Sequence, residues 1–426
     1  MQASKDQIRA NDTAQSPPAR APRVLHLVSS PLSTLLMRGQ LRYLSEKGFE
    51  VLLASAPGPQ LQDVSKADQV QAIEVKIDRE MSPFKDILAL WRLFRLMRRL
   101  KPDITNVSTP KAGLLGGLAA RIAGVPCRIY TLRGLRWETT SGLKRALLKL
   151  TEWIACRCAH RVICVSSGVR ENLVAEHASF RQHTIVFGSG SSNGVDIRRF
   201  VPCWQNQADA AALRARLGIP PDALVIGFAG RLTRDKGICE LYEAYTKLRR
   251  QFPLLRLLVA GDFEAGDPVP ATVRRSIESD SSVVRSGFVV DIADFYRVMD
   301  VFVLPTYREG FPTAVLEAQA SGIPVVTTTA TGAIESVVNG TTGLVVPVAD
   351  VEALTSAIGV LLADAPLRSR MGHAGRDWVV KHFRSEVIWE ALAEEYSQLL
   401  LAKGLAVTLQ GMAPTKIANS FRREFQ

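Results

Sequence analysis

The chain has 426 residues, which is enough for two or three domains, and 47% of them are hydrophobic, so it can bury substantial cores. Its formal net charge of +12 can attract nucleic acid, anionic lipid or phosphorylated small molecules. No uncharged apolar run reaches 18 residues, and the cysteines match no paired zinc spacing, so the sequence predicts a cytosolic protein with reduced thiols and without a membrane span.

Residues 1–22 are polar and rich in proline, and they are predicted to form a disordered leader because they hold too little apolar surface to offset the entropy of ordering. From Val24 onward, short apolar runs alternate with helical patterns. The predicted strands cover 24–28, 51–55, 103–107, 127–132 and 161–165. The predicted helices lie near 34–47, 84–100, 112–123, 143–158 and 167–176. This alternation predicts a parallel sheet covered by helices.

A break follows at FGSGSSNGVD (187–196), whose glycines and serines indicate a linker or hinge. Further strands are predicted at 224–230, 255–261, 283–289, 301–305, 323–328 and 343–347, with helices over 236–251, 312–321 and 350–363. The sequence thus predicts two doubly wound domains, 23–190 and 191–382, that face each other across a cleft. A last helix over 383–402 is expected to cross back to the first domain, and 403–426 form a tail.

The segment GRLTRDKG (230–237) follows a strong predicted strand and opens a predicted helix. It therefore places Arg231 and Lys236 at the carboxyl end of a strand, where parallel sheets bind ligands. A forked guanidinium and a compact ammonium can approach different oxygens of a diphosphate. The alternative is an exposed basic loop without a ligand.

A second anion-binding element is predicted at EGFPTAVLE (309–317), where Pro312 suits the first position of a helix. The amides of Thr313 and Ala314 would then have no intrahelical partner and could donate to a phosphate. The glutamates at the two ends of this segment need a different role, since carboxylates and phosphates repel each other.

The E-x7-E pattern of Glu309 and Glu317, with the R-x4-K pattern of Arg231 and Lys236, resembles the retaining GT-B glycosyltransferases of family four. The resemblance runs from Arg23 to about Leu401. The interdomain stretch 192–200 is also similar to this family. Segments 109–126, 131–138 and 162–173 resemble a bacterial branch of the family that builds surface polysaccharide on polyprenyl-diphosphate carriers. The resemblance implies an α/β fold of two Rossmann-like parallel-sheet domains.

The resemblance also implies a UDP-sugar donor, carrying an N-acetylhexosamine or a hexose. Its diphosphate would contact Arg231 and Lys236. Its ribose hydroxyls would donate to Glu317, and the hydroxyls of the transferred sugar would donate to Glu309. Arg231 and Lys236 would stabilise the charge of the departing diphosphate and Glu309 the charge at the anomeric carbon, so these three are the predicted catalytic residues. The other donor-binding positions implied are Gly230, Gly287, Val289, Gly310, Phe311, Pro312, Thr313 and Ala314.

Neither a metal nor a cofactor is expected. The chain has no DxD triplet, with which other transferases hold a divalent ion, and fixed cations would take that place. The resemblance implies retention of anomeric configuration, with the donor phosphate assisting deprotonation of the acceptor.

Two departures from the family pattern affect the acceptor side. Relatives often have a glycine pair after the first strand, whereas here Gly39 comes too late to serve. They also often have His-Gly where this chain has Arg133-Gly134, and an arginine is a poor proton carrier at neutral pH. The predicted acceptor-side residues are Lys111 and Arg133, and the implied acceptor is a polyprenyl-diphosphate-linked sugar.

Residues 84–101 (FKDILALWRLFRLMRRLK) combine apolar residues at helical spacing with clustered basic residues. Such a helix can lie on an anionic bilayer, or it can be an ordinary helix that covers the sheet. A second basic stretch spans 143–161. We expect an anionic membrane surface as a partner and a peripheral position on the inner face of the cytoplasmic membrane, and we do not expect nucleic acid.

Three other functions are compatible with parts of this sequence. A hydrolysing UDP-sugar 2-epimerase shares the two-domain fold, but such enzymes usually lack the GFP-type helix opening beside the E-x7-E pair. A transferase with a soluble acceptor would keep the same donor site. A binding protein without activity would have no need of both glutamates and both cations.

Overall fold

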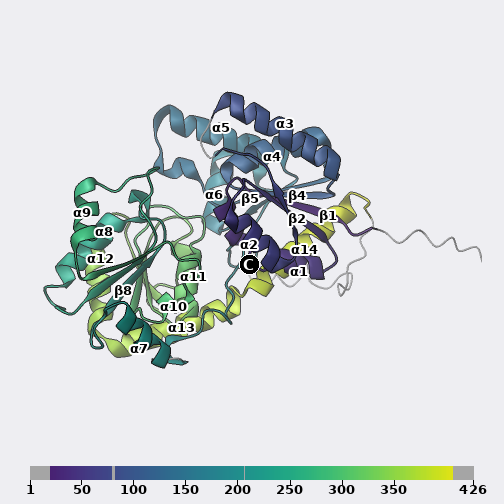
Figure 1. Cartoon of the computed structure of the whole chain (residues 1–426). Coiled ribbons are helices and arrows are strands. Elements are labelled where there is room, and N and C mark those ends of the chain that lie inside the picture. Colours follow the sequence, from purple (N-terminus) through teal and green to yellow (C-terminus); the bar gives the residue numbers. More distant parts are fainter. Residues whose placement is uncertain (1–19, 79–81, 206, 406–426) are drawn as a thin grey trace, which may run out of the picture.

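The computed structural model describes residues 20–78, 82–205 and 207–405, so most of the predicted leader (1–22) and tail (403–426) lies outside the described residues. The chain forms two α/β domains, drawn in purple to blue and in teal to green in Figure 1. A final helix, drawn in yellow, runs back beneath the first domain.

The first domain is built on a parallel sheet of seven strands in the order β3-β2-β1-β4-β5-β6-β7. The strands are β1 (Arg23–Leu27), β2 (Glu50–Ser55), β3 (Gln71–Glu74), β4 (Ile104–Ser108), β5 (Cys127–Leu132), β6 (Arg161–Cys164) and β7 (Thr184–Ile185). The helices are α1 (Gln40–Glu46), α2 (Pro59–Asp68), α3 (Pro83–Leu100), α4 (Pro110–Ala123), α5 (Gly142–Cys158) and α6 (Ser167–Glu176).

Alternate residues of these strands enter two separate cores, as the two-residue period of a strand requires. Leu25 and Leu27 of β1 pack with residues of α3, α4, α5 and α6 on one face of the sheet. Val24, on the opposite face, packs with residues of α1 and α2. Helices therefore cover both faces of the sheet, as is usual for a parallel sheet.

The second domain contains a parallel sheet of six strands in the order β10-β9-β8-β11-β12-β13. The strands are β8 (Val225–Ala229), β9 (Arg256–Ala260), β10 (Val283–Gly287), β11 (Val301–Leu304), β12 (Val325–Thr328) and β13 (Gly343–Val346). The helices are α7 (Gln207–Arg216), α8 (Ile238–Leu248), α9 (Ala271–Ser279), α10 (Ala293–Tyr296), α11 (Thr313–Ala320), α12 (Val351–Ala363) and α13 (Ala365–His382). The two parallel sheets confirm the predicted α/β class of two Rossmann-like domains.

The last helix, α14 (Ser385–Ala402), packs against the first domain although it follows α13 of the second (Figure 1). Its fully buried Tyr396 accepts a 2.7 Å hydrogen bond from the Asn106 side chain, and Thr131 donates to the same asparagine over 2.8 Å. The ring nitrogen of His26 lies 3.3 Å from the Tyr396 hydroxyl. This buried polar network fixes the helix against the face of the sheet formed by β1, β4 and β5.

Several elements differ from the sequence-based predictions. The short strands β3 and β7, the helices α2, α7, α9 and α13, and the four-residue α10 were not predicted. The helix predicted near 34–47 is a 3₁₀ segment, Pro31–Met37, followed by α1. The predicted first helical position of Pro312 is wrong by one residue, because its extended backbone (ψ 101°) makes it the N-cap and α11 begins at Thr313. Within the described ranges, no helix is both long and apolar enough to cross a bilayer.

Candidate active site

The predicted catalytic residues come from loops at the carboxyl ends of β8 and β11, which are neighbours in the second sheet. Arg231 follows β8, and Lys236 ends a 3₁₀ turn before α8. Glu309 lies in the loop between β11 and α11. Gly237 allows this close approach, because a Cβ there would lie 1.9 Å from the Pro305 carbonyl oxygen.

Lys236 and Glu309 form an ion pair, and each side chain is only 14% exposed. The sequence assigned the lysine to the diphosphate and the glutamate to the sugar, and the structure brings the two groups into direct contact. An ammonium has three donors, so Lys236 can hold Glu309 and still donate to a phosphate oxygen. The pair therefore suits the junction between a diphosphate and the sugar attached to it.

Arg231 pairs with Glu264, which follows β9. Half of the arginine side chain remains exposed. Glu264 was not predicted, because nothing in its local sequence marks it as the partner of a residue 33 positions earlier. The ion pair orients the guanidinium, which has five donors and can bind an anion with those that Glu264 leaves free.

Glu317 occupies a very different environment from Glu309. The hydroxyl of Tyr296 in α10 donates a 2.9 Å hydrogen bond to its carboxylate. Burial raises the pKa of Glu317 to about 7, although the Tyr296 bond and the nearby charge of Arg199 act in the opposite direction. The carboxylate is thus poised to gain from hydrogen-bond donors such as ribose hydroxyls.

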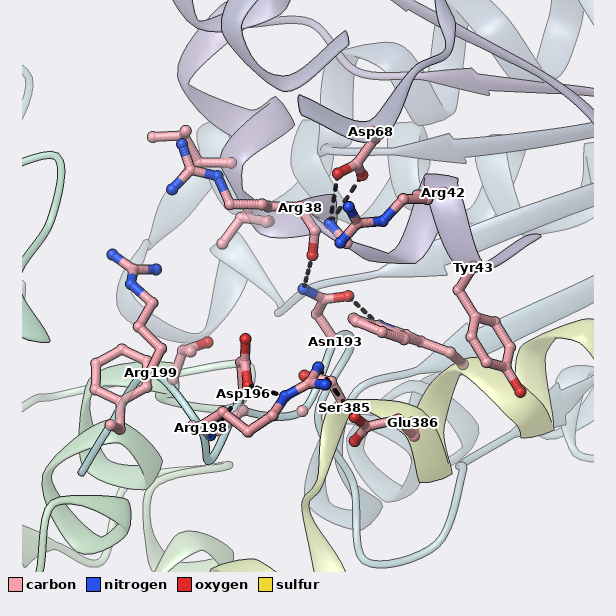
Figure 2. A pocket seen from close by; sticks show the side chains of 18 of the residues that line it. Arg38, Arg42, Tyr43, Asp68, Asn193, Asp196, Arg198, Arg199, Ser385 and Glu386 are labelled. Atoms are coloured by element: carbon pink, nitrogen blue, oxygen red, sulfur yellow. Dashed lines mark hydrogen bonds and ion pairs between the residues drawn. The ribbon is translucent and has the colours of Figure 1, made fainter. Parts of the chain in front are cut away.

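A pocket of about 810 Å³ lies between the domains, and Glu317 and Thr313 line it from the second domain. Figure 2 shows Arg38 of the first domain and Arg199 of the linking segment extending toward the same side of this pocket. Arg199 donates a hydrogen bond to Asp291 over 2.8 Å. Burial raises the pKa of Asp291, but this bond and the nearby positive charges, including that of Arg38, lower it by more, so the pKa lies below its ordinary value. Neither arginine was singled out from the sequence.

The loop after Glu309 is pressed against the first domain. A Cβ on Gly310 would lie 2.0 Å from the Arg133 carbonyl oxygen, so only glycine fits there. The ring of Phe311 packs against Gly190, where a Cβ would lie 2.7 Å from the ring. These contacts close the cleft on the side of the predicted sugar site.

Other contacts across the cleft hold the two domains together. The Glu335 carboxylate accepts hydrogen bonds from the amides of Ser167 and Gly168, at 2.7 and 2.8 Å, at the N-terminus of α6. A carboxylate is stabilised at this end of a helix. The Arg308 guanidinium also donates to the Thr139 hydroxyl over 3.0 Å.

The remaining predicted donor positions are found at the same edge of the second sheet. Gly230 follows β8, and Gly287 ends β10 in a left-handed conformation (φ 66°), with Val289 in the loop beyond it. Pro312 and Ala314 flank the start of α11. Among these neighbours, Val290 and Ile292 line the interdomain pocket.

The two predicted acceptor-side residues are in different surroundings. Lys111, near the start of α4, forms a 2.7 Å ion pair with Asp86 of α3. Arg133 lies at the cleft, next to Gly310, and its guanidinium donates to the Ser192 hydroxyl.

Among the described residues there is no group of three or more His, Cys, Asp or Glu that could hold a metal.

Comparisons with known proteins identify the family of the chain. Residues 23–166 match the family model "Glycosyl transferase 4-like", and residues 223–364 match the model "Glycosyl transferases group 1". The chain is 37% identical over 379 residues to the capsular polysaccharide biosynthesis glycosyltransferase CapM of Staphylococcus aureus, covering 89% of this chain and 97% of the relative.

A second relative is the Escherichia coli UDP-Gal:alpha-D-GlcNAc-diphosphoundecaprenol alpha-1,3-galactosyltransferase, with 28% identity over 89% of this chain and 98% of the relative. In fold, the chain is similar to Anabaena HepE, solved with UDP and glucose, with a TM-score of 0.73, 19% identity and coverage of 88% of this chain and 99% of that one. It is also similar to WaaG, with a TM-score of 0.70, 15% identity and coverage of 88% and 99%.

These matches confirm the family resemblance seen in the sequence, and they leave the epimerase and the inactive binding protein without support. The chain belongs to the group 1, family-four-like glycosyltransferases with the GT-B fold, and it is a glycosyltransferase.

Proposed function

We propose that this enzyme moves a sugar, an N-acetylhexosamine or a hexose, from a UDP-linked donor to a polyprenyl-diphosphate-linked saccharide during assembly of a surface polysaccharide. Retention of anomeric configuration and independence of metal are part of the proposal. The E. coli relative is named for this kind of donor and acceptor, and the S. aureus relative for capsular polysaccharide.

One observation carries the donor assignment. Helix α11 presents Glu317 and Thr313 to the interdomain pocket, while Glu309, just before the same helix, pairs with Lys236. A nucleoside diphosphate sugar fits this order: ribose at Glu317, diphosphate at the helix start and the two cations, and sugar at Glu309.

In the proposed reaction, the acceptor hydroxyl oxygen attacks the anomeric carbon while the bond between that carbon and the UDP oxygen breaks. Negative charge gathers on the departing diphosphate, where Arg231 and Lys236 stabilise it. The acceptor proton passes to a departing phosphate oxygen on the same face of the sugar, so the configuration is retained. Glu309 offsets the positive charge at the anomeric carbon.

We further propose that the first domain docks on an anionic bilayer, where a polyprenyl-linked acceptor would reside. The first half of α3 exposes Phe84 (88%) and Trp91 (53%), while the face of α3 that includes Leu93 is buried in the core. Basic side chains follow along the helix, and the Arg95 guanidinium lies 4.6 Å from the centre of the Trp91 ring. The helix thus covers the sheet with one face and presents an aromatic, cationic face outward, which fits an anionic lipid surface.

Helix α5 repeats this pattern. It exposes Leu143 (91%) and Trp153 (38%), together with Lys144 and Arg145. Both helices pack against α4, and Figure 1 shows all three on the same side of the first domain. Lys149 pairs with Glu176 over 2.6 Å and is therefore a weaker candidate for contact with lipid.

The experiment that tests the donor assignment is a thermal-shift screen of UDP-, GDP- and ADP-sugars. A ligand at 100 times its Kd stabilises the native state by about 2.7 kcal/mol, so UDP-sugars should raise the unfolding midpoint and the other nucleotides should do so much less. The Glu317→Ala variant should lose this shift, whereas Glu352→Ala, on the exposed surface of α12, should keep it. A larger shift with GDP- or ADP-sugars would contradict the proposal.

A further inference from the structure

Arg133 is a cation without an anionic partner inside the cleft. Its guanidinium donates to the neutral hydroxyl of Ser192, and its Nε is buried without a hydrogen-bond partner. Among the described residues no carboxylate pairs with it. Burial alone lowers the pKa of Arg133 to about 10, so the group remains charged at neutral pH.

The groups behind Arg133 are polar but carry no negative charge. It shares a cavity of about 10 Å³ with His26, Asn106 and Thr131. Burial, aided by the charge of Arg133, lowers the pKa of His26 to about 3, so this ring is neutral. A buried cation left without a counter-ion is destabilising, and groups of this kind are concentrated at functional sites.

The backbone places Arg133 next to the proposed donor groups. A Cβ on its neighbour Gly134 would lie 3.2 Å from the Gly310 nitrogen, and Gly310 directly follows Glu309, the partner of Lys236. On its other side, Ser192 lines the 810 Å³ pocket. Arg133 therefore lies between the loop that contains Glu309 and Gly310 and the 810 Å³ pocket, and part of the residue remains exposed.

We propose that Arg133 is a phosphate-binding residue of the cleft, whose missing counter-ion is a phosphate group of a substrate. The inference rests on the proposed function, because both substrates of that reaction carry a diphosphate. A forked guanidinium binds phosphate through two parallel hydrogen bonds, whereas the histidine of relatives would offer one donor and a proton. Arg133 thus acts as a fixed cation in the binding of substrate.

The test compares Arg133→Gln with Ser192→Ala, which removes the same hydrogen bond and leaves the cation in place. Two quantities are measured: the Kd for UDP by calorimetry, and the KM for the polyprenyl-diphosphate-linked acceptor at saturating donor. Arg133→Gln should weaken one of them by roughly 10- to 100-fold, the range for a hydrogen bond to a charged group. The quantity that changes identifies whether the phosphate belongs to the donor or to the acceptor.

The alternative is that Arg133 only anchors the linking segment through Ser192. In that case Ser192→Ala would reproduce the loss and lower the unfolding midpoint as much as Arg133→Gln does, which would overturn the inference. Normal values for Arg133→Gln in both measurements would also overturn it. Arg133→Lys keeps a cation and should fold even if Arg133→Gln does not, and its expected loss is smaller but still exceeds that of Ser192→Ala.

The test of Arg133 and the test of the proposed donor can fail independently of each other. If the wild type binds pyrophosphate but no uridine nucleotide, the proposed donor is wrong, and the comparison of variants can be repeated with pyrophosphate as the probe. If the wild type binds UDP and uses the acceptor while Arg133→Gln behaves identically, the proposed function stands and the role of Arg133 is wrong.

Discussion

The two glutamates of the E-x7-E pattern differ in their charge environment at the scale of single residues. Glu309 is paired with Lys236, whereas Glu317 is buried beside the Tyr296 hydroxyl and has a pKa of about 7. A carboxyl group with a pKa near 7 is about half protonated at neutral pH, and its ionised form accepts hydrogen bonds from hydroxyl groups best. The two residues should therefore respond differently to pH.

We predict that affinity for UDP-glucose falls as the pH drops below about 7, by up to about tenfold per pH unit, because protonated Glu317 must lose its proton to accept from the ribose. UDP-glucose is used because its diphosphate has no terminal phosphate that titrates near pH 6, as that of UDP does. Calorimetry between pH 6 and 8 should give a flat profile for Glu317→Gln and the wild-type slope for Glu309→Gln. An unchanged slope in Glu317→Gln would contradict the assignment.

A second prediction concerns the cations. Lys236→Ala and Arg231→Ala should each slow transfer by roughly 10²–10³-fold, the scale for removing one stabiliser of developing charge. Arg234→Ala is the matched control, because Arg234 lies in the same turn and is exposed. Steady-state rates that are equal for Lys236→Ala and Arg234→Ala would disprove the role of the lysine.

The sequence pointed to Arg231 and Lys236, and to Glu309 and Glu317, because the two members of each pair stand at a fixed spacing along one continuous segment. It did not reveal Glu264, Tyr296 or Arg199, which meet the predicted residues only through tertiary folding. Glu264 reaches Arg231 from the next strand of the sheet, and Tyr296 reaches Glu317 from a four-residue helix. Such contacts leave no local pattern.

At the scale of elements, the apolar strands and most of the longer helices were predictable, whereas the short strands β3 and β7 and five helices, among them the 18-residue α13, were not. β7 has two residues, and α7 has no buried residue, so neither shows a clear period. Pro312 suited a first helical position by propensity, but its extended backbone places it one residue earlier.

Helix α3 gives the prediction at this scale. A variant with Arg92, Arg95, Arg98 and Arg99 changed to Gln should lose most binding to anionic vesicles, since each basic residue near such a surface contributes about 1 kcal/mol. Wild-type binding should weaken as salt rises. In vesicle flotation, Phe84→Ser with Trp91→Ser should weaken binding without removing its salt dependence.

Two outcomes would count against this docking. If the wild type does not float with anionic vesicles at low salt, the first domain does not dock. If the arginine variant floats as well as the wild type, docking belongs to another surface, and Lys144 and Arg145 of α5 are the next residues to change.

At the scale of the whole molecule, two charged side chains are among the groups that hold the domains together across the cleft. The carboxylate of Glu335 binds two amides of α6, and Arg308 binds Thr139. Hydrogen bonds to a charged group contribute about 1.5–3 kcal/mol each, so a single residue can shift the balance between closed and open arrangements.

We therefore predict that Glu335→Ala enlarges the radius of gyration in solution scattering, because α6 loses its partner in the second domain. Glu352→Ala is the control, since that glutamate pairs with Lys247 within the second domain on an exposed surface. An identical radius for wild type and Glu335→Ala would show that this contact does not hold the domains together.

Transfer of radiolabelled sugar from UDP-sugars to a polyprenyl-diphosphate-linked saccharide in excess chelator is the most direct test of the proposed reaction. Wild type should place label in the lipid extract, and Lys236→Ala should place roughly 10²–10³-fold less. Lipid that stays unlabelled with every UDP-sugar, or labelling that chelator abolishes and manganese or magnesium restores, would contradict it.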